Sequence, residues 1–305
     1  METTNNPIFH TIESALKDPL SVKYLDLNYT NLETFPKEVF KLENLEELAI
    51  YNNKIKEIPD EIASLKKLKK INISGNNLTT VPACISKLDE LEVLILSWNA
   101  ISSLPAEIGD FKKLKVLSLS NNHLKTLPNE LCNLASLEEL ILNENDLLEL
   151  PEAIGKLSNL KKLRVGGGYL KTLPESISNL TNLDKLEVHQ NNLTSLPHSI
   201  GNMANLTKLR AYNNLLTELP ESLCSLAKLK KLILYKNDLE RLPEDFGNLE
   251  NLTELDISVN ELKSMPKSIN KLKNLRIANL GRNNFSTEEK VRIQSEINST
   301  SINWN

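Results

Sequence analysis

Residues 114–136, LKVLSLSNNHLKTLPNELCNLAS, contain one unit of a pattern that the chain repeats every 23 residues. Eleven of the 13 prolines mark this period, from Pro36 to Pro266, without an insertion or a deletion. A fixed period of roughly 20 to 50 residues indicates a stack of similar coils rather than an ordinary globular domain. Differences in function between such coils must come from the side chains that point outward.

Each unit combines two apolar periodicities. With Leu114 as position 1, the apolar positions are 1, 4, 6, 11, 14, 18 and 21. Leu117 and Leu119, at positions 4 and 6, alternate with polar neighbours, which is typical of a strand with one buried face. Positions 18 and 21 suit a helical turn. The proline at position 15 suits a turn or the first position of a helix. We therefore predict a short strand, a turn, and a short helical or 3-10 return in every repeat.

Position 9 is asparagine in ten of twelve repeats. A buried amide at this position can bond backbone groups of its own turn and of the next coil, so stacked coils would form a ladder. Thr30 and Gly168 are the two exceptions. We expect Thr30 to belong to a terminal repeat and Gly168 to weaken one rung of the ladder.

The unit LxxLxLxxNxLxxLPxxIxxLxx resembles the leucine-rich-repeat family, and residues 22–285 match it. The 23-residue form with a Leu-Pro pair looks like the intracellular type found in bacterial repeat proteins, plant Ras-group repeat proteins and Ras-pathway scaffolds. The resemblance implies an α/β repeat solenoid, a right-handed horseshoe with a parallel concave β-sheet and short helical or 3-10 convex segments. It also implies protein–protein recognition, and it carries over no catalytic residues.

We expect a single domain with capped ends: an N-terminal cap over residues 1–21, twelve repeats over 22–285 with the last one truncated, and a C-terminal cap over 286–305. The first cap would hold a short amphipathic helix, from His10 or Thr11 to Lys17. A capping box at residues 286–289 predicts a second helix to about Glu296, with Val291, Ile293 and Ile297 partly buried. The alternation over residues 301–304 could add an edge strand.

Composition excludes several classes of protein. A net charge of −4 and an isoelectric point near 5.8 give no bias toward nucleic acid or membranes. The first 19 residues lack the pattern of a secretory signal. Cys84, Cys132 and Cys224 lie in repeats 3, 5 and 9, too far apart for a disulfide. We therefore predict a cytoplasmic monomer with no disulfide, and leave open export by a route that needs no signal peptide.

No pattern in the sequence points to catalysis, a metal or a cofactor. The four histidines form no cluster with one another or with the cysteines. Residues 166–168 are all glycine, but they lack the lysine and hydroxyl residue of a phosphate-binding loop. We interpret them as a turn variant and leave open whether they form a flexible point. An enzyme would need converging acid, base or nucleophile groups, so we predict that the protein is not an enzyme.

Outward positions 3, 5 and 7, with position 8 at the rim, map the predicted concave face. Repeats 4–6 place an apolar set on it, namely Val93, Ile95, Trp98, Val116 and Ile141. A contiguous apolar patch often marks an interface, and tryptophan is enriched in binding hot spots. The alternative is that β-branched residues simply favour strands.

Repeats 7–10 carry a different set on the same face. Position 3 is Lys162, Lys185, Lys208 and Lys231; the candidates at positions 5 and 7 are Arg164, Glu187, His189, Arg210, Tyr212, Ile233 and Tyr235. Arginine and tyrosine are enriched in interfaces, and Glu187 between two arginines could hold both guanidinium groups in place. The lysines could instead serve only solubility. We predict that these repeats contact an acidic protein surface.

The leading hypothesis is a non-enzymatic scaffold whose concave face binds a protein partner and not nucleic acid or a membrane. The alternative is a bacterial effector that binds and modulates a host signalling protein by the same face. An enzyme is the third and weakest reading.

Overall fold

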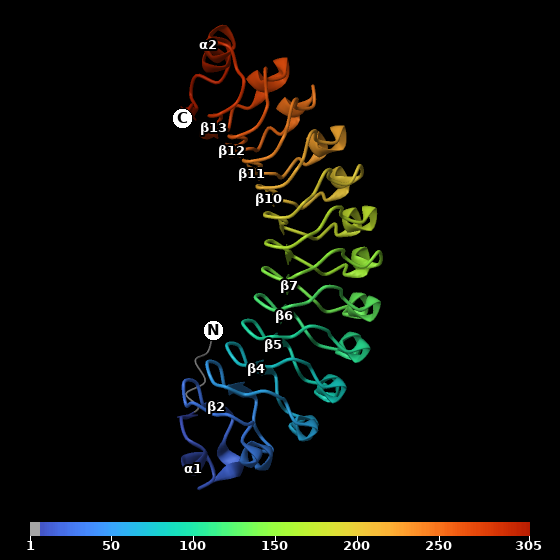
Figure 1. Cartoon of the computed structure of the whole chain (residues 1–305), viewed down its shortest axis with the longest axis vertical. Coiled ribbons are helices and arrows are strands. Elements are labelled where there is room, and N and C mark those ends of the chain that lie inside the picture. Colours follow the sequence, from blue (N-terminus) through green and yellow to red (C-terminus); the bar gives the residue numbers. More distant parts are fainter. Residues whose placement is uncertain (1–6) are drawn as a thin grey trace. The chain divides into compact units, whose positions relative to one another are not determined.

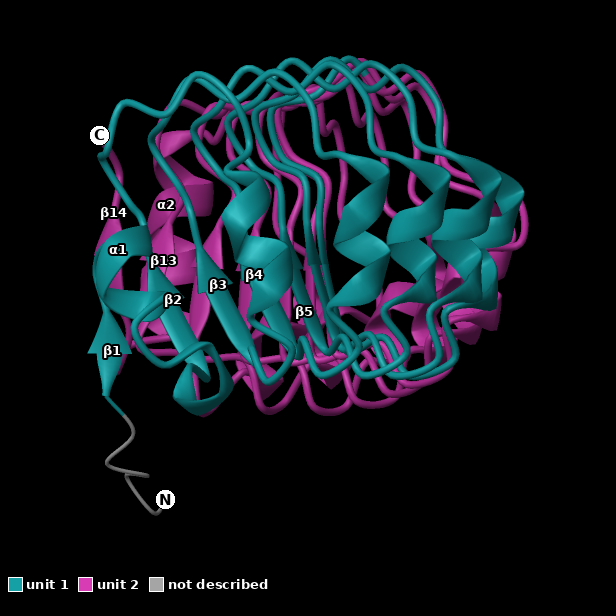
Figure 2. Ribbon diagram, turned by 90° about the horizontal axis from the view of Figure 1, so that it is seen from below, with its two compact units in different colours: residues 1–146 teal, residues 147–305 magenta. Residues whose placement is uncertain are grey.

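The computed structural model describes residues 7–305 and divides into two compact units, residues 1–146 and 147–305. In each unit short parallel strands follow one another on one side and 3-10 turns lie on the other (Figures 1 and 2). This arrangement confirms the predicted α/β repeat solenoid with a parallel sheet. The single-domain organisation remains a prediction, and residues 1–6 of the predicted N-terminal cap lie outside the described residues.

The strands pair in chain order within each unit, with a constant register of 23 residues between neighbouring repeats. Those of residues 1–146 are β1 (Ile8–Phe9), β2 (Tyr24–Asp26), β3 (Glu47–Ala49), β4 (Lys70–Asn72), β5 (Val93–Ile95), β6 (Val116–Ser118) and β7 (Glu139–Ile141). Those of residues 147–305 are β8 (Lys162–Arg164), β9 (Lys185–Glu187), β10 (Lys208–Arg210), β11 (Lys231–Ile233), β12 (Glu254–Asp256), β13 (Ile277–Asn279) and β14 (Ser301–Asn303).

The return segments are 3-10 turns. In the first unit they are η1 (Pro19–Ser21), η2 (Lys37–Lys41), η3 (Asp60–Ser64), η4 (Ala83–Lys87), η5 (Ala106–Asp110) and η6 (Asn129–Asn133). In the second unit they are η7 (Ile154–Lys156), η8 (Glu175–Asn179), η9 (Ile200–Asn202), η10 (Glu221–Ser225), η11 (Phe246–Asn248) and η12 (Lys267–Lys271). The repeat proline comes just before the turn: the carbonyl of Pro128 accepts a hydrogen bond from Leu131 N at 3.1 Å.

The predicted apolar positions form the core of each unit. In residues 114–136 all seven leucines are buried, including Leu117 on β6 and Leu131 on η6. Each fully buried leucine contributes about 1.5 to 3 kcal/mol relative to an exposed one. Because each coil repeats this set, neighbouring coils bury a continuous column of leucine side chains.

The asparagine ladder is present, and it connects each coil to the preceding one rather than to the next. Asn122 Oδ1 accepts from Ile101 N at 2.9 Å, in the preceding coil. Asn122 Nδ2 donates to Leu96 O of that coil at 3.1 Å and to Leu119 O of its own coil at 2.9 Å. Each buried amide thus satisfies backbone groups in two coils, which an apolar side chain would leave without partners.

Position 8 has a left-handed backbone in every repeat, which the sequence pattern does not predict. The φ angles lie between +52° and +71°. The residues are Tyr29, Asn52, Gly75, Trp98, Asn121, Glu144, Gly167, Gln190, Asn213, Lys236, Val259 and Arg282. Asparagine and glycine tolerate this conformation, whereas a β-branched residue such as Val259 is strained in it.

The N-terminal end differs in detail from the prediction. The helix α1 spans Ile12–Ala15 and is shorter than expected, with Thr11 capping it and Ala15 buried. Residues Ile8–Phe9 form the unpredicted strand β1, which pairs with β2. No repeat period covers these residues, so the sequence offers no signal for a two-residue strand.

At the C-terminal end, the helix α2 (Thr287–Glu296) starts where the capping box predicts, and Ser286 Oγ accepts from Glu289 N at 3.1 Å. The Glu289 carboxylate, however, accepts from Met265 N at 2.7 Å instead of closing the box. Ile293 and Ile297 are buried as predicted, but Val291 is 66% exposed, so its predicted burial is wrong. The predicted edge strand forms as β14 and pairs with β13.

Candidate functional site

The apolar candidates of the first unit lie on the outward face of β5–β7. The register sets Val93 beside Val116. Ser118 lies between Ile95 on one neighbouring strand and Ile141 on the other. These four apolar side chains are half-buried. The patch is therefore made of one valine pair and two isoleucines separated by a serine.

Trp98 is the most exposed member of this set. It follows β5 at position 8, where φ is +59°, and it is 66% exposed. The left-handed backbone turns the residue away from the regular alternation of the strand. An indole with this exposure offers a large apolar area to a partner.

The charged candidates of the second unit converge on one buried carboxylate. Glu187 Oε2 lies 3.5 Å from Arg164 Nε, and Glu187 Oε1 lies 3.8 Å from an Arg210 guanidinium nitrogen. Lys208 Nζ lies 3.4 Å from Glu187 Oε1. Glu187 thus lies within ion-pair distance of both arginines. Three cations share one carboxylate, so the cluster keeps an excess of positive charge.

The two arginines keep unused hydrogen-bonding capacity. Within residues 7–305, Arg164 Nε and Arg210 Nε are buried and have no hydrogen-bond partner. The Arg164 and Arg210 side chains are still 35% and 39% exposed. A planar guanidinium presents several N–H groups in a fixed fork that matches a carboxylate.

Beside this cluster, three aromatic rings form a stack at position 7. The rings of His189 and Tyr212 are 4.5 Å apart with an interplanar angle of 15°. Those of Tyr212 and Tyr235 are also 4.5 Å apart, at 9°. Burial lowers the pKa of His189; Glu187 opposes this effect and Arg210 adds to it. Burial also raises the pKa of Tyr212. The imidazole therefore tends to be neutral when it stacks.

The glycines at 166–168 belong to this packing and not to a phosphate site. A Cβ atom on Gly166 would lie 2.5 Å from the His189 ring, so a side chain at 166 would collide with the stack. Gly167 occupies the left-handed position 8 with φ +71°. The predicted turn variant thus has two causes: Gly166 leaves room for the His189 ring, and Gly167 adopts a positive φ angle.

The four lysines at position 3 lie in register on β8–β11. Lys208 contacts Glu187, Lys185 lies 3.8 Å from Asp184, and Lys231 pairs with Glu254. The like charges are therefore partly compensated. Ile233 is next to Arg210 in the register but is only 8% exposed, so it contributes little contact area.

Sequence reasoning missed a pocket in the first repeats. A cavity of about 240 Å³ lies over β2–β4 and is lined by Ile8, Tyr24, Leu25, Asp26, Glu47, Leu48, Ala49, Tyr51, Lys70 and Asn72. The signal was a single alanine at outward position 5 with tyrosines at positions 3 and 7 nearby. The concave-face candidates predicted from the sequence all lie in repeats 4–10 and include none of these residues.

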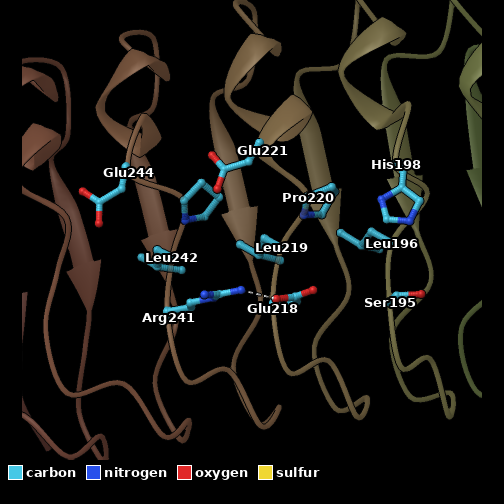
Figure 3. A pocket seen from close by; sticks show the side chains of 11 residues that line it. Ser195, Leu196, His198, Glu218, Leu219, Pro220, Glu221, Arg241, Leu242 and Glu244 are labelled. Atoms are coloured by element: carbon cyan, nitrogen blue, oxygen red, sulfur yellow. Dashed lines mark hydrogen bonds and ion pairs between the residues drawn. The ribbon is translucent and has the colours of Figure 1, made fainter.

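Another pocket lies away from the strand face (Figure 3). Its volume is about 360 Å³, and its walls come from positions 13–16 of repeats 8–10, with Arg241 and Glu218 paired at 2.7 Å. A similar pocket in the first unit is lined by Pro36, Pro59 and their neighbours. The recurrence at equivalent positions indicates a groove that the repeat itself produces, and none of the candidate residues lines it.

Residues 7–305 contain no group of three or more His, Cys, Asp or Glu side chains placed to hold a metal. The three cysteines of this part of the chain form no disulfide. Burial raises the pKa of Cys84 and of Cys224 to about 11, which makes both thiols poor nucleophiles at neutral pH. Among the described helices, none has the length and apolar character needed to span a membrane.

The stacked coils and the ordered strand face define a solenoid repeat protein. A family model described as "Leucine-rich repeat region" matches residues 13–100 and 130–220, more than half of the chain, and a second, "Leucine rich repeat", matches residues 90–147. The chain belongs to the leucine-rich-repeat family. The 23-residue intracellular subtype remains a prediction.

Solved structures from several organisms are similar. A leucine-rich-repeat protein of Leptospira interrogans is 27% identical, with 98% of this chain and 100% of that chain covered and a TM-score of 0.50. The internalin InlF of Listeria monocytogenes shares the fold at 22% identity, with 92% and 79% covered and a TM-score of 0.79. The plant peptide hormone receptor RGFR1, in complex with RGF2, is 25% identical, with 93% and 55% covered and a TM-score of 0.64. Comparison with curated protein sequences gives no match.

Proposed function

We propose that the protein is a non-enzymatic scaffold that binds a protein partner through the outward faces of its strands. The observation that carries this proposal is the Glu187 cluster of the second unit. There Arg164, Arg210 and Lys208 surround one buried carboxylate beside a stack of aromatic rings. Such a surface combines arginine side chains with rigid aromatic area, and arginine and tyrosine are residue types that protein interfaces enrich.

The partner of this cluster is an acidic protein surface. A partner carboxylate between Arg164 and Arg210 would compensate the charge that Glu187 leaves over and would use the exposed guanidinium N–H groups. The hydroxyl ends of Tyr212 and Tyr235 add hydrogen-bonding groups next to the same place. RGFR1, a plant peptide hormone receptor similar along 93% of this chain, was solved in complex with RGF2, which supports a role in binding a partner.

The apolar set of the first unit would supply a second contact. Trp98 is the strongest candidate in it, because its indole is mostly exposed while Val93 and Val116 are half-buried. Removing the indole would cost the interface an aromatic anchor, whereas the valines contribute packing area.

Affinity capture from candidate cell lysates followed by mass spectrometry tests this function. We would compare the native chain with Arg164→Glu/Arg210→Glu and with Trp98→Ala. Lys171→Glu/Lys263→Glu is the matched control, since it makes the same charge change at exposed position 12 of the second unit. We expect a protein that both site variants lose and the control retains. Equal capture by all four chains would refute binding through the strand face.

A bacterial effector that modulates a host signalling protein is the alternative. The full-length similarity to a repeat protein of the bacterium Leptospira interrogans favours it. Detection of the protein in host cytosol during contact would support this alternative, and strict retention in the producing cell would refute it. In either case we propose a monomer. We also propose a reducing, cytoplasmic compartment, because the three cysteines lie in separate coils and form no disulfide.

A further inference from the structure

The pocket of the first unit has a defined cause in the sequence. The register sets Asp26, Ala49 and Asn72 side by side at position 5 of β2, β3 and β4. Alanine is the smallest of the three, so a hollow of about 240 Å³ opens over it. Tyr24 and Tyr51 also line this hollow. The volume lies below the roughly 300 to 1,000 Å³ of drug-sized sites, so it suits one side chain.

The Tyr51 ring, which lines the hollow, is held in place by neighbouring groups. The rings of Tyr29 and Tyr51 pack edge to face, 5.2 Å apart at 78°. The backbone N–H of Tyr51 donates to Asn28 Oδ1 at 2.8 Å. A braced ring keeps its π face available at low entropic cost to a ligand that enters the hollow.

Two carboxylates face the same hollow and are only weakly compensated. Asp26 Oδ2 lies 3.8 Å from His10 Nδ1, and Glu47 Oε2 lies 3.7 Å from Lys70 Nζ. These contacts are long and lie at the surface, where ion pairs contribute little. Burial is the main cause that raises the pKa of Tyr51; the neighbouring Tyr29 adds to it, and the charge of Asp26 adds least.

We propose that this hollow binds an arginine side chain of a partner polypeptide. The methylene stem packs on Ile8 and Ala49. The guanidinium lies against the tyrosine rings and donates to the Asp26 and Glu47 carboxylates. An acidic side chain would meet two carboxylates, Asp26 and Glu47, against the single ammonium group of Lys70 in the lining. A purely apolar one would remove water from two carboxylates without replacing their hydrogen bonds. The site lies in a different unit from the Glu187 cluster and binds the opposite charge.

Blocked pentapeptides Gly-Gly-X-Gly-Gly test the proposal, with X as arginine, citrulline or glutamate. Binding to the full chain is followed through the NMR signal of the Tyr51 ring, which lines the hollow and is retained in every variant below. Citrulline has nearly the shape of arginine but no charge. We expect saturable binding of the arginine peptide, weaker binding of citrulline by about tenfold, and no binding of glutamate. Equal affinity for arginine and citrulline, or no binding of arginine, would overturn the proposal.

Variants assign the binding to this hollow. Asp26→Asn/Glu47→Gln should weaken the arginine peptide about tenfold without changing the volume, and Ala49→Leu should fill the hollow and abolish binding. Glu254→Gln/Asp256→Asn is the matched control, since it neutralises carboxylates at the same positions 3 and 5 of β12. Equal binding by the Asp26/Glu47 variant and the native chain would refute the site. Arg164→Glu/Arg210→Glu should leave peptide binding unchanged, which separates this test from that of the proposed function.

Discussion

At the scale of single residues, the left-handed backbone at position 8 is the constraint that the sequence pattern hides. Asparagine or glycine fills it in five repeats, but Trp98, Val259 and other residues also occupy it. A residue-type signal is therefore absent, since the stacked coils impose this φ angle whatever the side chain. The consequence is a set of local strains that substitution can relieve.

Val259→Asn should stabilise the protein. Valine at φ +54° costs on the order of 1 kcal/mol, and asparagine tolerates that angle. The hydrogen bond from Val259 N to Gly281 O needs only the backbone and is retained. We expect an increase of about 1 kcal/mol in the free energy of unfolding by urea, and a smaller gain for Val259→Ala. A loss of stability in Val259→Asn would show that the packing of the valine side chain contributes more free energy than the backbone strain costs.

Gly168→Asn should also stabilise, because it restores the ladder residue. Positive φ angles among the described glycines occur at Gly75 and Gly167, so residue 168 has an angle that asparagine adopts. The new amide would accept from Leu147 N and donate to Val165 O, as Asn191 does with Leu170 N and Val188 O. We expect the free energy of unfolding, measured by chemical denaturation, to increase by about 1 kcal/mol. A lower unfolding midpoint would mean that the new amide does not fit.

Gly166→Ala, two residues earlier in the chain, should destabilise the protein instead of stabilising it. Its Cβ atom would lie 2.5 Å from the His189 ring, so the ring must leave its place on Tyr212. We expect a loss of about 1 to 3 kcal/mol. In the background of His189→Ala, which removes the ring, the same substitution should be nearly neutral. A double-mutant cycle by urea unfolding measures this coupling, and equal losses in both backgrounds would contradict the collision.

At the scale of elements, the strands and turns follow from the repeat, whereas the ends depend on contacts that no period encodes. Leu117 and Leu119 predict a strand because two neighbouring leucines on one face must be buried. Ile8 and Phe9 join the sheet only because β2 leaves an edge beside them. Similarly, the capping box locates the start of α2 correctly, but it does not predict that Glu289 binds another coil.

Glu289→Gln should loosen the C-terminal cap. Its carboxylate accepts from Met265 N at 2.7 Å and from Arg292, whose guanidinium also donates to Met265 O at 2.6 Å. We expect a loss of about 1 to 2 kcal/mol, measured by urea unfolding at neutral pH. Glu288→Gln, one residue earlier, should have a smaller effect. Equal effects of the two substitutions would show that the loss of stability comes from removing a negative charge at the start of the helix, and not from the contacts of Glu289 with Met265 and Arg292.

The acid dependence of this contact has a defined sign. The Arg292 hydrogen bond is the main cause that lowers the pKa of Glu289. A carboxyl with a lowered folded pKa stabilises the protein above its unfolded pKa, near 4.3, and this contribution is lost as the pH falls toward the folded pKa. The difference in stability between the native chain and Glu289→Gln should therefore shrink below about pH 4.3.

At the scale of the whole molecule, the 23-residue period predicts which coils are neighbours, and hence the strand register, because an unbroken repeat fixes every spacing. The period also places Glu187 between Arg164 and Arg210. It does not predict the hollow over Ala49, nor that the His189 ring rests above Gly166. Those features depend on how the volumes of side chains from adjacent coils fit together, and a pattern of residue types does not contain that information.

A repeat architecture also predicts that a destabilising substitution lowers the stability of its own coil and of the neighbouring coils only. Asn214 accepts from Leu193 N at 3.0 Å and donates to Val188 O and Ala211 O at 3.1 Å. Asn214→Ala should cost about 2 to 4 kcal/mol, because it leaves several buried backbone groups unsatisfied. Native-state hydrogen exchange should accelerate at the amides of repeats 8 and 9, while Ile101 N and Leu124 N in the first unit keep their protection. If exchange rose equally at all ladder amides, the molecule would unfold as one cooperative block, and the nearest-neighbour description would fail.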